Sequence, residues 1–200
     1  MDYIKYINDF KLQSDQSFLE NVKRFYEETD TTTTFYHGQM VANEAVKLSN
    51  ENHSQLYPAG LLHDISAFIP KSKRLDISEK LHIPILKEEH QVPLLLHQKL
   101  SAYIAKKCFQ INDSNILDAI ECHTTLKKNF NNFDLTVFLA DKIAWDQPGT
   151  PPYLEKLNEA LKDSQSKAAL VYINYLLSHN LLVAHPWLLA AQKQLTLECK

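Results

Sequence analysis

The chain has 200 residues, of which 44% are hydrophobic, and a formal net charge of -3 at pH 7. This length and composition predict a single globular domain over residues 1–200, large enough to bury one core. The small negative charge offers no basic surface to the backbone of DNA or RNA, so no nucleic-acid partner is expected.

Glycine and cysteine usage excludes several kinds of site. The three glycines, Gly38, Gly60 and Gly149, are far apart, whereas a P-loop or a dinucleotide-binding turn needs clustered glycines. Any phosphate must therefore be bound by side chains or metal ions. The three cysteines form no CxxC pair, which predicts neither a disulfide framework nor a thiolate zinc site.

No targeting or membrane segment is apparent. The N-terminal stretch lacks the apolar core of a secretory signal, and no run of ~18 apolar residues occurs that could cross a bilayer. We expect a soluble cytoplasmic protein with no membrane partner.

Apolar residues at i, i+3 and i+4 spacing predict an all-α fold. Ser14 or Asp15 is the predicted cap of the first helix, and Pro58 is placed in a first turn, where its missing N–H has no partner to lose. A motif core of about 35–145 is expected, with C-terminal helices of about 150–197 packing on it. The predicted helices cover, in chain order, residues 15–28, 36–50, 58–68, one or two short helices within 71–90, then 93–109, from a cap at 112–114 to 123, 134–145, one starting at 150 or 151, 164–179, and one starting at 186.

Four histidines and two aspartates fall on helix faces that are otherwise apolar. His123 follows Ile116 by seven positions and Ile120 by three, so it continues a buried stripe. Asp141 follows Val137 by four positions. The same reasoning places four more polar side chains toward the core: His37, His63, Asp64 and His97.

A shared cation explains this pattern best. A single buried histidine is more often a hydrogen-bonded core residue than a metal ligand. Burying four imidazoles and two carboxylates without compensation, however, costs several kcal/mol each, on the order of a domain's whole stability. Nitrogen and oxygen donors suit Fe, Mn, Zn or Mg. Six donors could close one site, or hold two metals ~3.5–4 Å apart with open positions for water and substrate, as catalysis requires.

The other five histidines are not predicted to be metal ligands, and the cysteine beside His123 is not predicted to be a nucleophile. Five histidines lie in polar stretches or near predicted helix ends, where solvent or capping roles are expected. Cys122 and His123 are neighbours in sequence, but consecutive helical residues do not face each other, so we interpret this pair as a coincidence.

Five segments resemble the motifs of the HD-domain metal-dependent phosphohydrolases: FYHGQMVANEA, AGLLHDI, LLHQKLSAYIA, ILDAIECHTT and FLADKI. The resemblance is closest to the bacterial symmetrical diadenosine tetraphosphate hydrolases of the YqeK type. It implies a single-domain HD-type helical bundle and a metal pair, often iron, that activates water for attack on phosphorus. Diadenosine tetraphosphate would be split into two ADP, and the family precedent implies a homodimer.

The resemblance also implies the site residues. The metal ligands it implies are His37, His63, Asp64, His97, His123 and Asp141. Asp64 is the expected catalytic residue, since it would touch both metals and orient the attacking water.

Two positions depart from the family pattern. The family usually has an arginine three residues before its first histidine, where this chain has Thr34, and a lysine in an HD-x-x-K pattern, where this chain has Ala67. Other cations beside the motifs are candidate substitutes: Lys71, Lys73, Arg74, Lys127, Lys128 and Lys142. Each is alternatively a solvated surface charge. The predicted phosphate contacts are Thr124, Lys127, Lys128 and Lys142.

Aromatic side chains beside the motifs have two interpretations. Tyr36, Phe68, Phe130 and Trp145 either stack on a nucleobase or pack in the core. Three hypotheses about function remain open. They are hydrolysis of a dinucleoside polyphosphate, the same chemistry on another nucleotide or phosphoester, and a metal-containing nucleotide-binding regulator without turnover.

Overall fold

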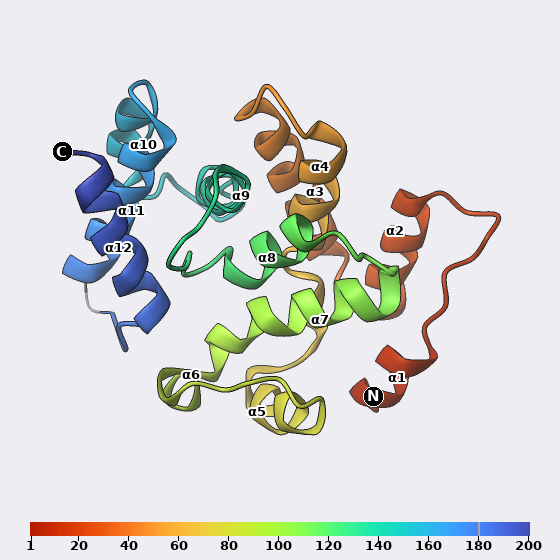
Figure 1. Ribbon diagram of the computed structural model, residues 1–200. Coiled ribbons are helices and arrows are strands. Elements are labelled where there is room, and N and C mark those ends of the chain that lie inside the picture. Colours follow the sequence, from red (N-terminus) through yellow and green to blue (C-terminus); the bar gives the residue numbers. More distant parts are fainter. Residues whose placement is uncertain (180) are drawn as a thin grey trace.

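The computed structural model describes residues 1–179 and 181–200, and within these ranges it contains helices and no β-strand (Figure 1). The prediction of an all-α fold is therefore confirmed. None of the helices in the described part has the length and apolarity needed to span a bilayer. The α-helices, with two short 3-10 helices η1 and η2, are α1 (Tyr3–Asp9), α2 (Phe18–Glu28), α3 (Thr32–Lys47), α4 (His53–Leu62), η1 (Ile65–Phe68), α5 (Lys71–Lys80), α6 (Lys87–Gln91), η2 (Pro93–Leu96), α7 (His97–Phe109), α8 (Ser114–Cys122), α9 (Asn132–Ile143), α10 (Leu154–Leu161), α11 (Gln165–Ser178) and α12 (Pro186–Glu198).

Local capping explains several helix starts. A capping box between Ser17 and Glu20 opens α2, so the predicted cap at Ser14 or Asp15 was wrong by two or three residues. Asp113, within the cap predicted at 112–114, caps α8, and Ser164, the predicted start of the helix 164–179, caps α11. No helix was predicted at the N-terminus, where α1 forms behind an Asp2 cap.

The helix around Pro58 differs from the prediction at both ends. α4 begins at His53, so Pro58 lies inside the helix instead of in its first turn. Proline removes one backbone hydrogen bond there. The fully buried Leu56 and Ala59 pack into the core on either side of it, and this tertiary packing outweighs the local preference. α4 also ends at Leu62 instead of Phe68, and η1 follows.

Helix α9 lies between two hydrophobic clusters. The larger cluster draws on α1 to α5 and α7 to α9, and the smaller one joins α9 to α10, α11 and α12. Val137 and Ala140 of α9 belong to the larger cluster, whereas Phe138 and Leu139 belong to the smaller. Figure 1 shows α9 end-on, between α3, α4 and α8 on one side and the C-terminal helices on the other. The C-terminal helices therefore pack against the helix that carries Asp141.

Helices α3 and α4 approach each other closely because glycine stands at their contact. A Cβ atom added to Gly60 would lie 2.6 Å from Cα of Ala42, and one added to Gly38 would lie 2.8 Å from the carbonyl oxygen of Leu61. Such distances are too short for any side chain, so both positions need glycine. This approach places α3 directly against the end of α4.

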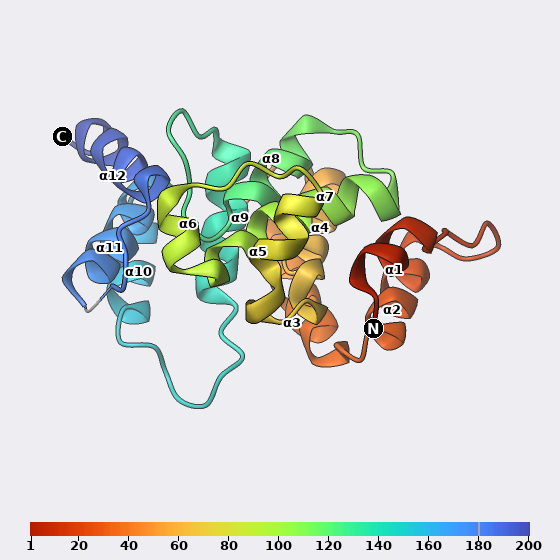
Figure 2. The same cartoon turned by 90° about the horizontal axis from the view of Figure 1, so that it is seen from below.

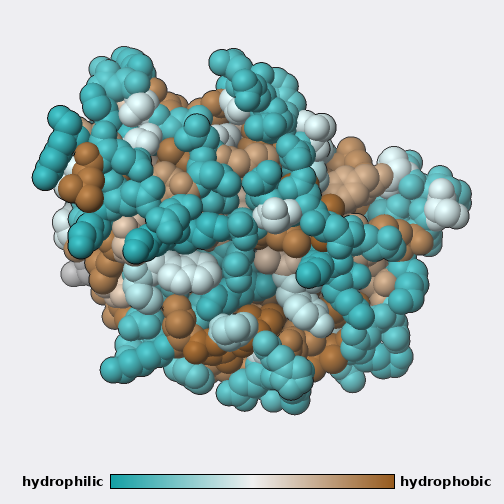
Figure 3. Space-filling model, viewed as in Figure 1, coloured by the Kyte–Doolittle hydropathy of each residue, from teal (hydrophilic) through white to brown (hydrophobic). Residues whose placement is uncertain are grey.

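One cavity lies away from the histidine motifs. It has a volume of about 580 Å³ and lies between residues 48–52, 132–136 and 164–166. In Figure 3 it corresponds to the notch at the top of a mostly hydrophilic face, while apolar side chains gather near the lower edge, over α5 and α6. None of the predicted site residues lines this cavity.

Candidate metal centre

Asp64 lies among three histidines from three different helix ends. Its Oδ1 is 3.5 Å from Nε2 of His97 and 3.5 Å from Nε2 of His123. Its Oδ2 is 3.7 Å from Nε2 of His63. The Asp64 carboxylate therefore lies at a junction between two sets of donors, with Oδ1 toward His97 and His123 and Oδ2 toward His63.

Asp141 completes the other side of this junction. Its Oδ1 is 3.3 Å from Nε2 of His37 and 3.5 Å from Nε2 of His63, so His63 is shared between the two sides. The six residues form three overlapping groups, and within each group the donor atoms all lie within 4.8 Å of one another. The groups are His37, His63 and Asp64; His63, His123 and Asp141; and Asp64, His97 and His123. All six predicted ligands are thus brought together, and overlapping groups of this kind suit two neighbouring metal ions.

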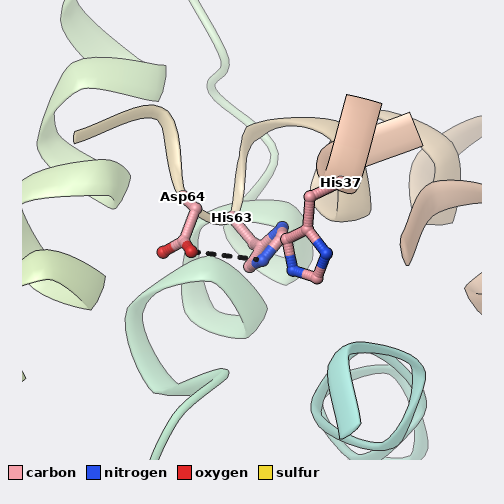
Figure 4. A group of neighbouring side chains, drawn as sticks. All are labelled: His37, His63 and Asp64. Atoms are coloured by element: carbon pink, nitrogen blue, oxygen red, sulfur yellow. Dashed lines mark ion pairs between the residues drawn. The ribbon is translucent and has the colours of Figure 1, made fainter. Parts of the chain in front are cut away.

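The chain breaks its helix at the adjacent pair His63 and Asp64. His63 keeps helical backbone angles, whereas Asp64 has φ -112° and ψ 23°. In an unbroken helix, consecutive side chains point about 100° apart. The break instead allows both side chains to face one centre, together with His37 from α3 (Figure 4). Ending α4 at Leu62 is therefore part of how the site is built.

Three of the histidines are oriented by the same backbone contact. The Nδ1 atoms of His63, His97 and His123 each lie 2.7–2.8 Å from the carbonyl oxygen three residues earlier. A carbonyl oxygen only accepts, so Nδ1–H is the donor in all three. In the neutral ring each Nε2 is then the unprotonated nitrogen and is directed at the centre, as a metal ligand must be.

Acceptors that face each other show that the donor set fits a cation. Nε2 of His97 and Nε2 of His123 are 3.0 Å apart, although the Nδ1 contacts give both a lone pair on that side. Nε2 of His63 is buried without a hydrogen-bond partner. Such contacts are unfavourable unless a proton or a metal ion lies between the nitrogens.

The charges in the site lead to the same conclusion. Burial lowers the pKa of His63, but the carboxylates of Asp64 and Asp141 outweigh it and raise this pKa to about 9. Burial opposes ionisation of Asp64, yet its histidine neighbours hold its pKa well below the usual range. Burial lowers the pKa of His97 to about 4. Without metal, then, an imidazolium and two carboxylates carry charge in a position that a metal ion could take.

Lys142, a predicted phosphate contact, is paired with a predicted ligand instead. It is buried, and its Nζ contacts Oδ2 of Asp141. The Nζ also lies 5.4 Å from the ring centre of Phe138 and 5.6 Å from that of Tyr172. Its charge therefore neutralises the outer oxygen of Asp141.

The other predicted phosphate contacts are placed differently from one another. Thr124 belongs to the site, because its Oγ1 is 2.9 Å from Nε2 of His97. Lys127 forms ion pairs with Asp118 at 3.2 Å and with Asp134 at 3.6 Å, so its charge has partners elsewhere. Lys128 is exposed.

Arg74, one of the six candidate substitute cations, is buried beside a predicted ligand. Its Nε donates to the carbonyl oxygen of Ile69, and its Nη1 donates to that of Leu94 at 2.9 Å. The Leu94 carbonyl also accepts from Nδ1 of His97, so Arg74 supports the orientation of that ligand. Among the described residues no carboxylate forms an ion pair with Arg74, although Asp64 is close enough to favour its charge. Only its approach to His97 in space distinguishes it from the lysines near it in sequence.

The mouth of the centre is neutral to acidic. A cavity of about 480 Å³ opens onto His37 and Asp64, and the rest of its lining is Thr33, Thr34, Asp146 and Gln147. The lining contains no lysine or arginine in the part of the chain described. No other cation of the described residues therefore lines this opening in place of the arginine and the lysine that the resemblance led us to expect.

The four aromatic candidates fall into two groups. Phe68 packs in the larger cluster, and Phe130 packs against the C-terminal cluster. Tyr36 and Trp145 are exposed, and each adjoins a residue that lines the mouth. Only these two remain as candidates to stack on a base.

Comparison with known proteins adds a family and relatives. The family described as HD domain matches residues 34–146. A Lactococcus lactis subsp. cremoris protein, described as an uncharacterized protein in the pepC 5'region, is 51% identical over 142 residues, which are 71% of this chain and 73% of that one. A symmetrical bis(5'-nucleosyl)-tetraphosphatase of Halalkalibacterium halodurans is 30% identical over 165 residues, covering 80% of this chain and 85% of that one.

A solved structure has the same fold. It is a predicted HD superfamily hydrolase involved in NAD metabolism from Clostridium acetobutylicum, with a TM-score of 0.82 and 23% sequence identity. The alignment covers 92% of this chain and 98% of that one.

Proposed function

This chain belongs to the HD-domain family of hydrolases, and on that premise we propose that it is a cytoplasmic metal-dependent phosphohydrolase acting on a nucleotide phosphoanhydride. The best candidate substrate is diadenosine tetraphosphate, with two ADP as products, because tetraphosphatases are among its relatives. The observation that carries the proposal is the convergence of four imidazoles and two carboxylates, with the Nε2 atoms of His97 and His123 facing each other at 3.0 Å.

The donor set suits a pair of metal ions, with iron as our first candidate and Mn, Zn or Mg as alternatives. When bound, such a pair lowers the pKa of a coordinated water toward neutrality and stabilises the oxygens of the phosphoryl group. His37, His63 and Asp141 would hold one ion. Asp64, His97 and His123 would hold the other.

The protein's own side chains would orient the reactants. Asp64 has an oxygen toward each side of the junction and lines the open cavity, so it is the proposed catalytic residue that accepts a hydrogen bond from the attacking water. Thr124 would donate a hydrogen bond to a phosphoryl oxygen once His97 Nε2 is engaged by metal. Lys142 would keep Oδ2 of Asp141 neutralised, so that Oδ1 alone faces the centre.

A second substrate class is favoured by one observation. The mouth carries Thr33, Thr34, Asp146 and Gln147 and no cation within the described residues. A polyphosphate with several charges would meet little compensation there beyond the metal ions. The same chemistry on a nucleotide or phosphoester of lower charge is therefore the alternative.

The test is metal analysis of the purified protein followed by an activity panel. Nucleotides, dinucleoside polyphosphates and simple phosphoesters would be offered with iron, manganese and zinc in turn. We expect ADP as the sole nucleotide product from diadenosine tetraphosphate, and loss of both metal and activity in Asp64→Ala. Release of phosphate or nucleoside from other substrates supports the alternative, and tight nucleotide binding without products indicates a regulator. Protein that contains no metal and gains none would refute the proposal.

A further inference from the structure

His37 lacks the backbone contact that orients the other three histidines. It lies in the middle of α3, where backbone carbonyls are engaged by the helix itself, whereas the other three lie at helix ends. Its Nδ1 is buried and has no hydrogen-bond partner within 3.5 Å. A histidine that binds metal through Nε2 normally donates its other N–H to an acceptor, which fixes the ring and its tautomer. His37 must find that acceptor outside its own helix.

A carboxylate from the segment between α9 and α10 lies beside this nitrogen. Oδ2 of Asp146 is 3.6 Å from Nδ1 of His37, just beyond hydrogen-bond distance. The opposite nitrogen of the ring, Nε2, faces Asp141. The imidazole therefore lies between two carboxylates, one in the centre and one at its mouth.

Asp146 is itself oriented by its neighbour. Nε2 of Gln147 donates to Oδ1 of Asp146 at 2.9 Å, which leaves Oδ2 directed toward His37. Both residues line the 480 Å³ cavity beside Asp64. Figure 2 shows that the segment between α9 and α10 loops out from the helices before α10 begins.

We propose that Asp146 is the positioning residue of His37. Its carboxylate accepts a hydrogen bond from Nδ1–H and so holds Nε2 toward the metal centre, and Gln147 fixes the carboxylate. This inference rests on the proposed metal centre, and it assigns no contact between Asp146 and the metal or the substrate. A shift of a few tenths of an ångström closes the 3.6 Å separation to a hydrogen bond. Because the other histidines use backbone carbonyls, only the metal ion held by His37 should depend on Asp146.

The experiment is a titration of metal-free protein with Mn²⁺ by calorimetry, without substrate. His37→Ala first identifies which binding step depends on His37. We then expect Asp146→Ala to weaken that step by about 10- to 100-fold and to leave the other step unchanged. Asp146→Glu should recover most of the affinity, because it keeps a carboxylate. Asp15→Asn removes an exposed carboxylate at the surface and serves as the matched control.

A double-mutant cycle tests the role of Gln147. If Gln147 acts only through Asp146, Gln147→Leu should weaken the His37-dependent step in the wild-type background and have no further effect in Asp146→Ala. Wild-type affinity in Asp146→Ala, or equal weakening of both steps, overturns the inference while the metal centre stands. Failure of the wild-type protein to bind Mn²⁺, Fe²⁺ or Zn²⁺ overturns the proposed function and this inference together.

Discussion

Lys142 and Asp141 are consecutive residues of α9, yet their charged groups form an ion pair at the edge of the candidate metal centre. Adjacent helical positions do not face each other, but the long lysine side chain bends back between the rings of Phe138 and Tyr172. The hydroxyl of Tyr153 donates to the Lys142 carbonyl oxygen. The C-terminal helices thus hold the residue that neutralises a predicted ligand.

Replacing Lys142 should destabilise the metal-free protein more than the metal-bound protein. We expect Lys142→Met to lower the free energy of unfolding without metal by about 3–5 kcal/mol, because it leaves a buried carboxylate unpaired. Bound metal should restore part of that loss, since it supplies the missing positive charge. Denaturant unfolding with and without Mn²⁺ measures both effects, with the exposed Lys193→Met as control. Equal losses in both conditions would show that Lys142 acts only by packing.

Gly60 should tolerate no side chain. In Gly60→Ala the new Cβ would lie 2.6 Å from Cα of Ala42, so α3 and α4 must separate. We expect a loss of about 1–3 kcal/mol in stability. Metal affinity should weaken as well, because His37 on α3 and His63 after α4 move apart. Ser54→Ala, at an exposed position of α4, should change stability by less than about 0.5 kcal/mol. Unaltered metal binding in Gly60→Ala would contradict the argument.

The metal-free protein should be most stable near pH 6.5. The pKa of His63 rises from 6.5 to about 9 on folding, so its contribution is complete below pH 6.5 and is lost as the pH increases to about 9. The pKa of His97 falls from 6.5 to about 4, so stability also decreases as the pH drops from 6.5 toward 4, where the unfolded chain binds a proton that the native state does not. Melting temperatures measured with a chelator from pH 4 to 9.5 test this, and His63→Gln should flatten the alkaline side. A melting temperature that rises between pH 6.5 and 9 would disprove it.

Restoring a cation near the HD pair should change substrate preference. Ala67 lies in η1, three residues after Asp64, at the position of the lysine in the HD-x-x-K pattern that the resemblance led us to expect. We expect Ala67→Lys to raise kcat/KM for diadenosine tetraphosphate by about tenfold, the effect of one additional charged contact of about 1.4 kcal/mol. Ala67→Gln has similar bulk without charge and should give no increase. An unchanged or lower rate in the lysine variant would show that the pocket suits a substrate of lower charge.

Much of the fold and the ligand set follows from the sequence because both depend on local patterns. Helical spacing of apolar residues predicted the all-α fold, and residue type alone placed the cap of α8 within residues 112–114 and the start of α11 at Ser164. The six donors stood out because each interrupts an apolar face. Where tertiary packing competes with local preference, as at Pro58 inside α4, the prediction failed.

The sequence by itself determined which six side chains are metal-ligand candidates, since polar groups on buried helix faces are visible as a pattern. Only the tertiary structure decided which charged side chains form ion pairs with these candidates. Lys127 and Lys142 looked equivalent in sequence, yet one pairs with Asp118 and the other with Asp141. No sequence pattern indicates the role of Asp146, because its partner His37 is more than a hundred residues away in the chain. Ion pairs and hydrogen bonds depend on distances of a few ångströms, which side-chain conformations and the packing of helices set, and periodicity along one helix contains no information about those distances.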